Sequence, residues 1–437
     1  MRMRQIVKAA VAVVAGLSST FAGAQSMELS LAQALKAAHN NVEVALARSA
    51  AVAAQADVQA ADRAPFPTLS AKFSSIDLQN GNGDGSLLAD RRYDKGVGID
   101  WTWERGNKRV LRTESAQRGA AAAQADVEEI QVQQLLAASA AFFDLAAAQD
   151  RVMQVEAIAA GTAQIASNAM RRVTAGDLAR QEALRLDIES ERAKGDVVAA
   201  TLDRQRAAYA LASVLGVAPS ARTLQARADW SSLDQSQPEA GGQDGVPANW
   251  TDNWTDSRVA VRADVRAATE RVAAARAALD GAGAQKKADI TWGMSLDHFP
   301  GTSTALLELR MQMPLQFGYH FQGETGRAQA QLTSAQDTLE KMRQMAALEL
   351  RGLQTQLQSA RARRQIYEQD ILPRARQVAA QAELAYVKGA LTLNDLFDAR
   401  RTLRATGLEA LAARADHAKT LTAWKLRTQP VAPLLVE

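Results

Sequence analysis

The residues best placed to do chemistry are two carboxylates, Asp395 and Asp398, in the sequence LTLNDLFDAR. On a helix, a spacing of three puts both side chains on one face. Repeated around a symmetry axis, such a pair would form rings of negative charge that attract cations. A simpler interpretation is that both acids stabilise the first turn of a helix, where negative charge is favourable. The two residues alone favour the simpler interpretation.

Other residues give little support for catalysis or metal binding. The chain has no cysteine, and its four histidines, at positions 39, 298, 320 and 417, do not have the spacing of metal ligands. His298 beside Asp297 is interpreted as an exposed loop residue. Met311 and Met313 could bind a soft metal, but they lie on a strand face that we assign to lipid. No nucleophile motif or phosphate loop occurs, so we predict no enzyme activity, no cofactor and no bound metal.

The first residues have the pattern of a secretory signal peptide. MRMRQIVKAAVAVVAGLSSTFAGAQS combines a basic start, a short apolar stretch and small residues at Ala22 and Ala24. We predict that residues 1–24 are removed and that the mature chain is exported. The apolar stretch is shorter than the roughly 20 residues of a membrane-spanning helix, which disfavours an N-terminal anchor. Without cysteine, the chain can form neither disulfides nor a lipid-modified cysteine.

The charge balance excludes a nucleic-acid partner. The 51 basic and 48 acidic residues give a net charge of +3, and Arg2, Arg4 and Lys8 of the signal peptide account for all of it. The mature chain is therefore close to neutral, without the excess of positive charge expected of a nucleic-acid binder.

Proline-free stretches predict unusually long helices. No proline occurs between Pro67 and Pro219. In this stretch, apolar and small residues recur at steps of three and four, which is typical of the contact face of a coiled coil. They are Val132, Leu135, Ser139, Phe142 and Ala146. One helix over 107–174 would be about 100 Å long. Two shorter helices with a break near Gly161 remain an alternative.

The chain also repeats itself. Residues 169–187 align with residues 382–400 at an offset of 213, which places Gly176 over Gly389. We predict a first repeat at 25–216, a linker at 217–254, a second repeat at 255–430 and a tail at 431–437.

Four stretches alternate between apolar and polar residues, as strands with two different faces do. They are LSAKF at 69–73, GVGIDWTW at 96–103, ITWGMSLDHF at 290–299 and LLELRMQMPL at 306–315. The pattern is that of a transmembrane β-barrel with lipid outside and water inside, although a small soluble sheet alternates in the same way. We place an extracellular loop at 76–95.

Two observations favour the barrel. The mature chain shows no apolar run that we expect to span a bilayer as a helix. Aromatic residues gather at the strands, as in the girdles of membrane barrels: Phe66, Phe73, Trp101, Trp103, Trp292, Phe299, Phe317, Tyr319 and Phe321. Four strands cannot close a barrel, so we predict a homotrimer that shares about twelve strands, in a mainly α-helical protein.

Together with WTWERGNKR after the second strand and QGETGRAQA after the fourth, these features resemble the TolC outer membrane efflux family. The two motifs are most similar to the CzcC-type branch that serves cobalt, zinc and cadmium exporters. The resemblance implies a passive exit duct for divalent heavy-metal cations, with a barrel in the outer membrane of a Gram-negative bacterium and a coiled-coil tunnel in the periplasm. It also implies a periplasmic adaptor and an inner-membrane pump of the RND type as partners. Alternatives are a duct for organic compounds or type I secretion, and a periplasmic coiled-coil adaptor.

The resemblance assigns roles to particular residues. It implies a periplasmic gate at Asp395 and Asp398, with Glu182 and Arg185 at the matching positions of the first repeat. The tips that contact the adaptor are Gly176, Asp177, Leu178, Gly389, Ala390 and Leu391. From the gathering of aromatic residues at the strands, rather than from the resemblance, we place Trp101, Trp103, Trp292, Phe317 and Tyr319 at the membrane interface.

Overall fold

The computed structural model describes residues 27–74, 79, 93–217, 224–230, 252–299 and 303–429. The predicted signal peptide, the tail and most of the predicted linker and extracellular loop lie outside the described residues.

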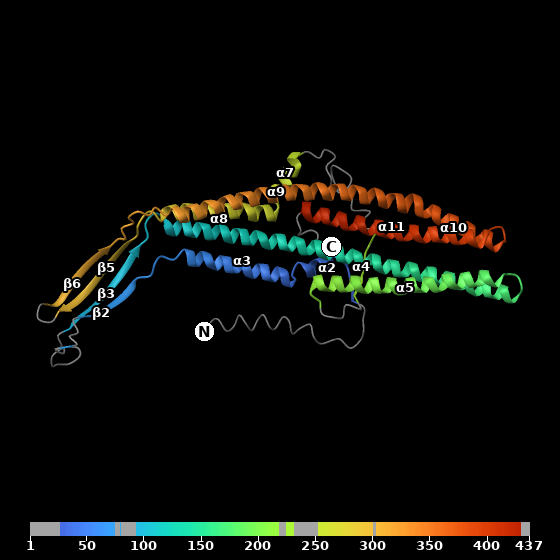
Figure 1. Ribbon diagram of the computed structural model, residues 1–437, viewed down its shortest axis with the longest axis horizontal. Helices are drawn as coiled ribbons and strands as arrows, with labels where there is room; N and C mark the ends of the chain where they lie inside the picture. Colours follow the sequence, from blue (N-terminus) through green and yellow to red (C-terminus); the bar gives the residue numbers. More distant parts are fainter. Residues whose placement is uncertain are drawn as a thin grey trace. The chain divides into compact units, whose positions relative to one another are not determined.

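The same series of elements occurs twice along the chain (Figure 1). The first series is α2 (Leu31–Ala38), α3 (Val42–Ala61), β2 (Thr68–Ser74), β3 (Asp94–Trp103), α4 (Lys108–Thr174) and α5 (Arg180–Leu215). The second is α7 (Asp252–Val261), α8 (Ala263–Ala284), β5 (Ile290–Phe299), β6 (Ser303–Gln312), α9 (Gln322–Gln365), the π-helical segment η4 (Ile366–Ile371), α10 (Leu372–Val387) and α11 (Leu393–Thr428). Two short strands, β1 (Met27–Leu29) and β4 (Leu224–Ala226), pair in parallel.

The long helices resolve the alternative that the sequence left open. Helix α4 is continuous over 67 residues and passes through Gly161 without a break. The matching part of the second series is interrupted instead, because η4 separates α9 from α10. Pro373 lies in the first turn of α10, where its missing N–H costs least. The π-helical segment takes up the change in hydrogen-bonding register before that proline.

One expectation about apolar runs was wrong. Among the described helices, α4 contains an 18-residue stretch with a mean hydropathy of 1.2, apolar enough by length and composition to cross a membrane. Buried core helices have the same composition, and α4 supplies Leu135, Phe142 and Phe143 to the core described below. Of the apolar stretch itself, 39% is buried within the chain.

The chain folds as two compact units, each drawn from both halves of the sequence. Unit 1 contains Met1–Val44, Ile130–Thr255 and Leu348–Glu437, and unit 2 contains Ala45–Glu129 and Asp256–Ala347. The repeat boundaries proposed from the sequence stay a prediction.

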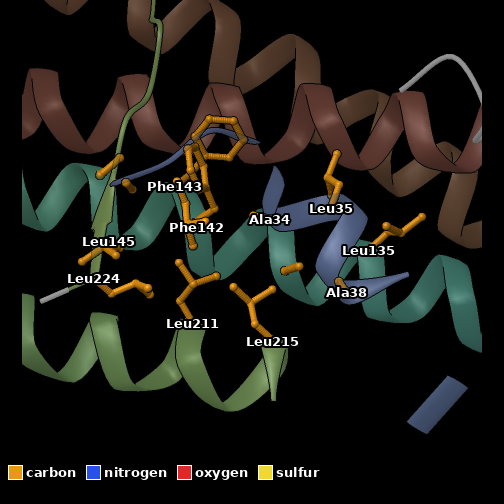
Figure 2. Packing of buried hydrophobic residues seen from close by; sticks show 14 of the residues in the cluster. Ala34, Leu35, Ala38, Leu135, Phe142, Phe143, Leu145, Leu211, Leu215 and Leu224 are labelled. Atoms are coloured by element: carbon orange, nitrogen blue, oxygen red, sulfur yellow. The ribbon is translucent and has the colours of Figure 1, made fainter. Parts of the chain in front are cut away.

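The core of unit 1 combines large residues of α4 and α5 with alanines of α2 (Figure 2). Phe142 and Phe143 meet edge to face, with ring centroids 5.4 Å apart. Burying each phenylalanine stabilises the fold by roughly 2–3 kcal/mol. Asn41 is a buried polar residue of unit 1, and its amide donates to Gln134 Oε1 at 2.7 Å. The helices can approach closely because Ala34 and Ala38 face this core.

Unit 2 contains an antiparallel sheet in the order β2-β3-β5-β6. Its apolar face is exposed, and the predicted alternation is confirmed. The exposed side chains include Leu69, Phe73, Val97, Ile99, Trp101, Trp103, Trp292, Met294, Leu296, Leu307, Leu309 and Met311. Five boundaries differ from those predicted: both ends of β2 (68–74 instead of 69–73), the start of β3, and both ends of β6 (303–312 instead of 306–315). Strand β3 begins at Asp94, and β6 ends at Gln312 because Pro314 has no N–H to continue the ladder.

Candidate functional site

The candidate gate lies at two helix–helix turns of unit 1. Helix α4 ends at Thr174 and α5 begins at Arg180, whereas α10 ends at Val387 and α11 begins at Leu393. Both boundaries of the second turn follow those of the first by 213 residues (387 minus 174, and 393 minus 180), the offset found in the sequence.

The two turns have the same backbone geometry. Gly176 has a φ of +86° and Gly389 a φ of +73°, values that favour glycine. Each helix ends in a pair of hydrogen bonds that together form a Schellman motif. They are Asp177 N to Arg172 O at 2.9 Å, Gly176 N to Val173 O at 3.1 Å, Ala390 N to Ala385 O at 2.9 Å and Gly389 N to Tyr386 O at 3.0 Å.

The turns differ in how the next helix begins. In the second turn, Thr392 and Asp395 form a capping box. The Thr392 hydroxyl donates to Asp395 Oδ2 at 2.5 Å and accepts from Asp395 N at 3.3 Å. In the first turn, Ala179 occupies the N-cap and offers no side-chain acceptor. The carboxylate of Asp395 thus has a structural role at the start of α11, as the simpler interpretation of the sequence requires.

Asp398 has no comparable role. Its side chain is 74% exposed, and its nearest cation is Arg401, at 3.6 Å. On α5, Glu182 is half-buried and Arg185 is exposed. Within the described residues, no ion pair joins Glu182 or Arg185 to the acids of α11. Asp398 is therefore the acid most available to a cation or to a second copy of the chain.

The predicted tip residues divide into two groups. Gly176, Asp177, Gly389 and Ala390 are exposed, whereas Leu178 and Leu391 are half-buried. Beneath the turns lies a small apolar cluster with Leu186 and Leu393 at its centre, and Leu178 packs against it. The cluster holds both turns in place and leaves their glycines at the surface.

A cavity behind the turns was not predicted from the sequence. It has a volume of about 490 Å³ and is lined by α4, α5, α10 and α11. Its basic residues are Arg376, Arg400, Arg401, Arg404 and Arg414. Most of them are neutralised, since Arg400 pairs with Glu383, Arg404 with Asp196 and Arg414 with Glu368. The run of arginines in ARRTLRATGLEALAAR was the available signal, but only the fold shows that they face one space.

The strands carry the predicted interface aromatics. Trp101 and Trp292 are register partners on the apolar face, 60% and 46% exposed. Trp103 is exposed at the end of β3. Phe317 and Tyr319 lie in the segment between β6 and α9, and Phe317 is 85% exposed. The apolar face is thus open from strand centre to strand end.

On the polar face, an ion pair crosses a whole strand. Arg310 of β6 donates to Asp100 Oδ1 of β3 at 2.5 Å, above Gly293 of the intervening β5. A Cβ atom at Gly293 would lie 2.4 Å from that carboxylate oxygen. The glycine therefore makes room for a pair that ties the edge strand to β3.

No protein-family model and no curated protein matches this sequence. Solved structures do match over nearly the whole chain. The CusC structure, from work on transmembrane channel formation, aligns with a TM-score of 0.76 and 17% identity, covering 91% of this chain and 92% of that one. The outer membrane protein VceC from Vibrio cholerae aligns with a TM-score of 0.71 and 17% identity, covering 91% and 96%. The open MtrE outer membrane channel of Neisseria gonorrhoeae aligns with a TM-score of 0.73 and 16% identity, covering 91% of this chain and 88% of that one. The chain thus has the fold of TolC-like channels, and the predicted mainly α-helical fold with four barrel-type strands is confirmed.

Proposed function

We propose that this chain is the exit duct of a tripartite efflux system in the outer membrane of a Gram-negative bacterium. The observation that carries the proposal is a four-stranded sheet with an exposed apolar face and two open edges, in a chain with the fold of TolC-like channels. Open edges are not tolerated in hydrocarbon, so other copies must pair with β2 and β6. A homotrimer supplies about twelve strands, enough for a water-filled barrel.

In this assembly the polar strand face lines the water-filled pore and the apolar face contacts lipid. The helices form a coiled-coil tunnel in the periplasm. A periplasmic adaptor docks at the exposed tips Gly176, Asp177, Gly389 and Ala390, and an inner-membrane RND-type pump feeds the tunnel. The duct is passive, without catalysis, cofactor or nucleic-acid partner.

The gate is proposed at the periplasmic end. Threefold symmetry would turn Asp395 and Asp398 into carboxylate rings, with Glu182 and Arg185 contributed by the neighbouring first repeats. The exposure of Asp398 supports this assignment, and the capping role of Asp395 is compatible with it because both acids face away from the buried residues of α11.

The solute is proposed to be a divalent heavy-metal cation. The support is the similarity of WERGNKR and QGETGRA to the CzcC-type branch. The alternative is a duct for organic compounds or for type I secretion. The alternative that this chain is a periplasmic adaptor is disfavoured, because a protein that stays in the periplasm would leave the apolar face of the four-stranded sheet in water.

The test has two parts. Membrane fractionation and planar-bilayer recording should find the protein in the outer membrane and show that it forms channels. A soluble periplasmic protein without channel activity contradicts the duct. Deletion in the native host should raise sensitivity to zinc, cobalt and cadmium; raised sensitivity to organic toxicants alone would favour the alternative solute.

A further inference from the structure

At one end of the sheet, four connecting segments are tied together. They are residues 61–66 before β2, 104–109 after β3, 285–289 before β5 and 313–324 after β6, and we name them the collar (Figure 1). Arg105 N donates to Asp289 Oδ1 at 2.9 Å, and Gln316 Nε2 donates to Gln285 O at 3.2 Å. Arg112 of α4 donates to Arg63 O at 2.9 Å. The collar is therefore one connected surface of unit 2.

All four carboxylates of the collar are already engaged. The contacts are Asp62 with Arg109 at 3.0 Å, Glu104 with Arg112 at 3.0 Å, Asp289 with Lys108 at 2.8 Å and Glu324 with the Tyr319 hydroxyl at 2.5 Å. Arg109 lowers the pKa of Asp62, and Tyr319 lowers that of Glu324. The collar's carboxylates are thus used in contacts with its own residues and with Arg112.

Four basic side chains of the collar have no such carboxylate. Among the described residues, no ion pair involves Arg63, Arg105, Lys286 or Lys287. The guanidinium of Arg63 lies over the ring of Phe66, 5.8 Å from its centroid. Lys286 and Lys287 are exposed. Counting all of their charged residues, the collar segments have six basic and four acidic side chains, a net charge of +2.

Large apolar side chains are exposed on the same collar. Phe66 is 73% exposed, Leu315 65% and Phe317 85%. In the segment that carries Leu315 and Phe317, Gly318 and Phe321 both have positive φ, +76° and +57°. Exposed apolar groups are unfavourable in water, whereas a membrane surface offers hydrocarbon for apolar groups and headgroups for cations.

We propose that the collar binds the phosphate groups of anionic phospholipids in the bilayer leaflet around this end of the sheet. The inference rests on the proposed membrane location and adds a ligand to it. Arg63, Arg105, Lys286 and Lys287 contact the headgroup phosphates, and the acyl chains lie along Phe66, Leu315 and Phe317. A membrane lipid, unlike free phosphate, satisfies both halves of this surface, and the apolar half continues into the exposed face of the strands.

The test uses the purified full-length protein in vesicles of phosphatidylcholine with a minor fraction of phosphatidylglycerol. Native mass spectrometry counts the lipids that remain bound. Wild type should retain phosphatidylglycerol preferentially. The double variant Lys286→Gln/Lys287→Gln should retain it on the order of tenfold less, because each lysine near an anionic surface adds to binding. The matched control is Lys341→Gln/Arg343→Gln, two exposed charges of α9 outside the collar.

Each result decides the question. Equal retention of both lipids by wild type, or undiminished retention by the collar variant, overturns the inference. Displacement of phosphatidylglycerol by inorganic phosphate would show a phosphate site that does not need the lipid chains, and would also overturn it. Conductance of the same preparations in pure phosphatidylcholine separates the two proposals: channels without a lipid preference refute the collar and leave the duct standing, whereas absence of channels refutes the duct.

Discussion

Asp395 and Asp398 differ in what their carboxylates contact, and this separates their contributions to the proposed gate. Asp398 is exposed and far from any cap, so Asp398→Asn should raise conductance and weaken block by trivalent cations while leaving thermal stability unchanged. Planar-bilayer recording with the cation added on the periplasmic side measures the block. Unchanged block would mean that Asp398 does not line the pore.

Thr392→Ala is the matched control for that experiment. It removes the N-cap of α11 but keeps both acids, so it should cost about 1 kcal/mol of stability and retain the block. If Thr392→Ala abolished the block as strongly as Asp398→Asn, loosening of the helix start, rather than loss of charge, would explain both results.

The polar face of the sheet offers a second test at single residues. Gly293→Ala places a Cβ 2.4 Å from Asp100 Oδ1 and forces the pair with Arg310 to separate. We expect a loss of about 1–3 kcal/mol, typical of overpacking, seen as a lower temperature of dissociation on unboiled gels. Gly326→Ala on α9 meets nothing within 4 Å and should be neutral or stabilising. Equal stability of the two variants would contradict the crossing pair.

At the scale of elements, the two Schellman turns make a symmetric prediction. Gly176→Ala and Gly389→Ala should each cost about 1 kcal/mol, because alanine is strained at positive φ although space is available. Asparagine tolerates this conformation better, so Gly389→Asn should lose less. Thermal denaturation gives the comparison. Equal losses for alanine and asparagine would show that something other than φ requires the glycine.

The strand faces can be tested through β3. Trp101 is exposed on the apolar face, whereas Thr102, on the other face, meets Thr291 at 3.0 Å between hydroxyl oxygens. Trp101→Arg places a charge in hydrocarbon, at a cost of about 2–4 kcal/mol near the midplane and less near the interface. Trp101→Arg should impair assembly in the outer membrane, and Thr102→Arg should not. Equal damage from both would contradict the assignment of faces.

The strands were predictable because alternation is a local signal. The ends of the strands were less predictable. The apolar alternation continues past Gln312, but the strand stops there because Pro314 has no N–H for the ladder. Whether α4 breaks at Gly161 could not be predicted, because packing along the helix decides whether one glycine is tolerated. The interruption before Pro373 has a visible cause, but its form as a π-helical segment depends on the register of the helix.

At the scale of the whole molecule, sequence reasoning worked through repetition and failed where distant segments meet. The offset of 213 located both turns. The arginine-lined cavity could not be found in this way, because Arg376 and Arg404 come from different helices and their distance in space is set by packing. The sequence suggested that Asp395 stabilises the first turn of a helix, but only the structure identifies Thr392 as its partner in the capping box.

The final prediction concerns assembly and follows from the open edges of the sheet. Strands β2 and β6 each have a neighbour on one side only, so their outer backbone groups lack partners within the chain. In hydrocarbon each unpaired group costs several kcal/mol, far more than a single chain can sustain along two strands. Purified protein in detergent should therefore have the mass of a trimer by light scattering, and on unboiled gels it should migrate more slowly than the monomer released by boiling. A stable monomer that keeps the full β-sheet signal in circular dichroism would show that the edges tolerate exposure, and the shared barrel would have to be abandoned.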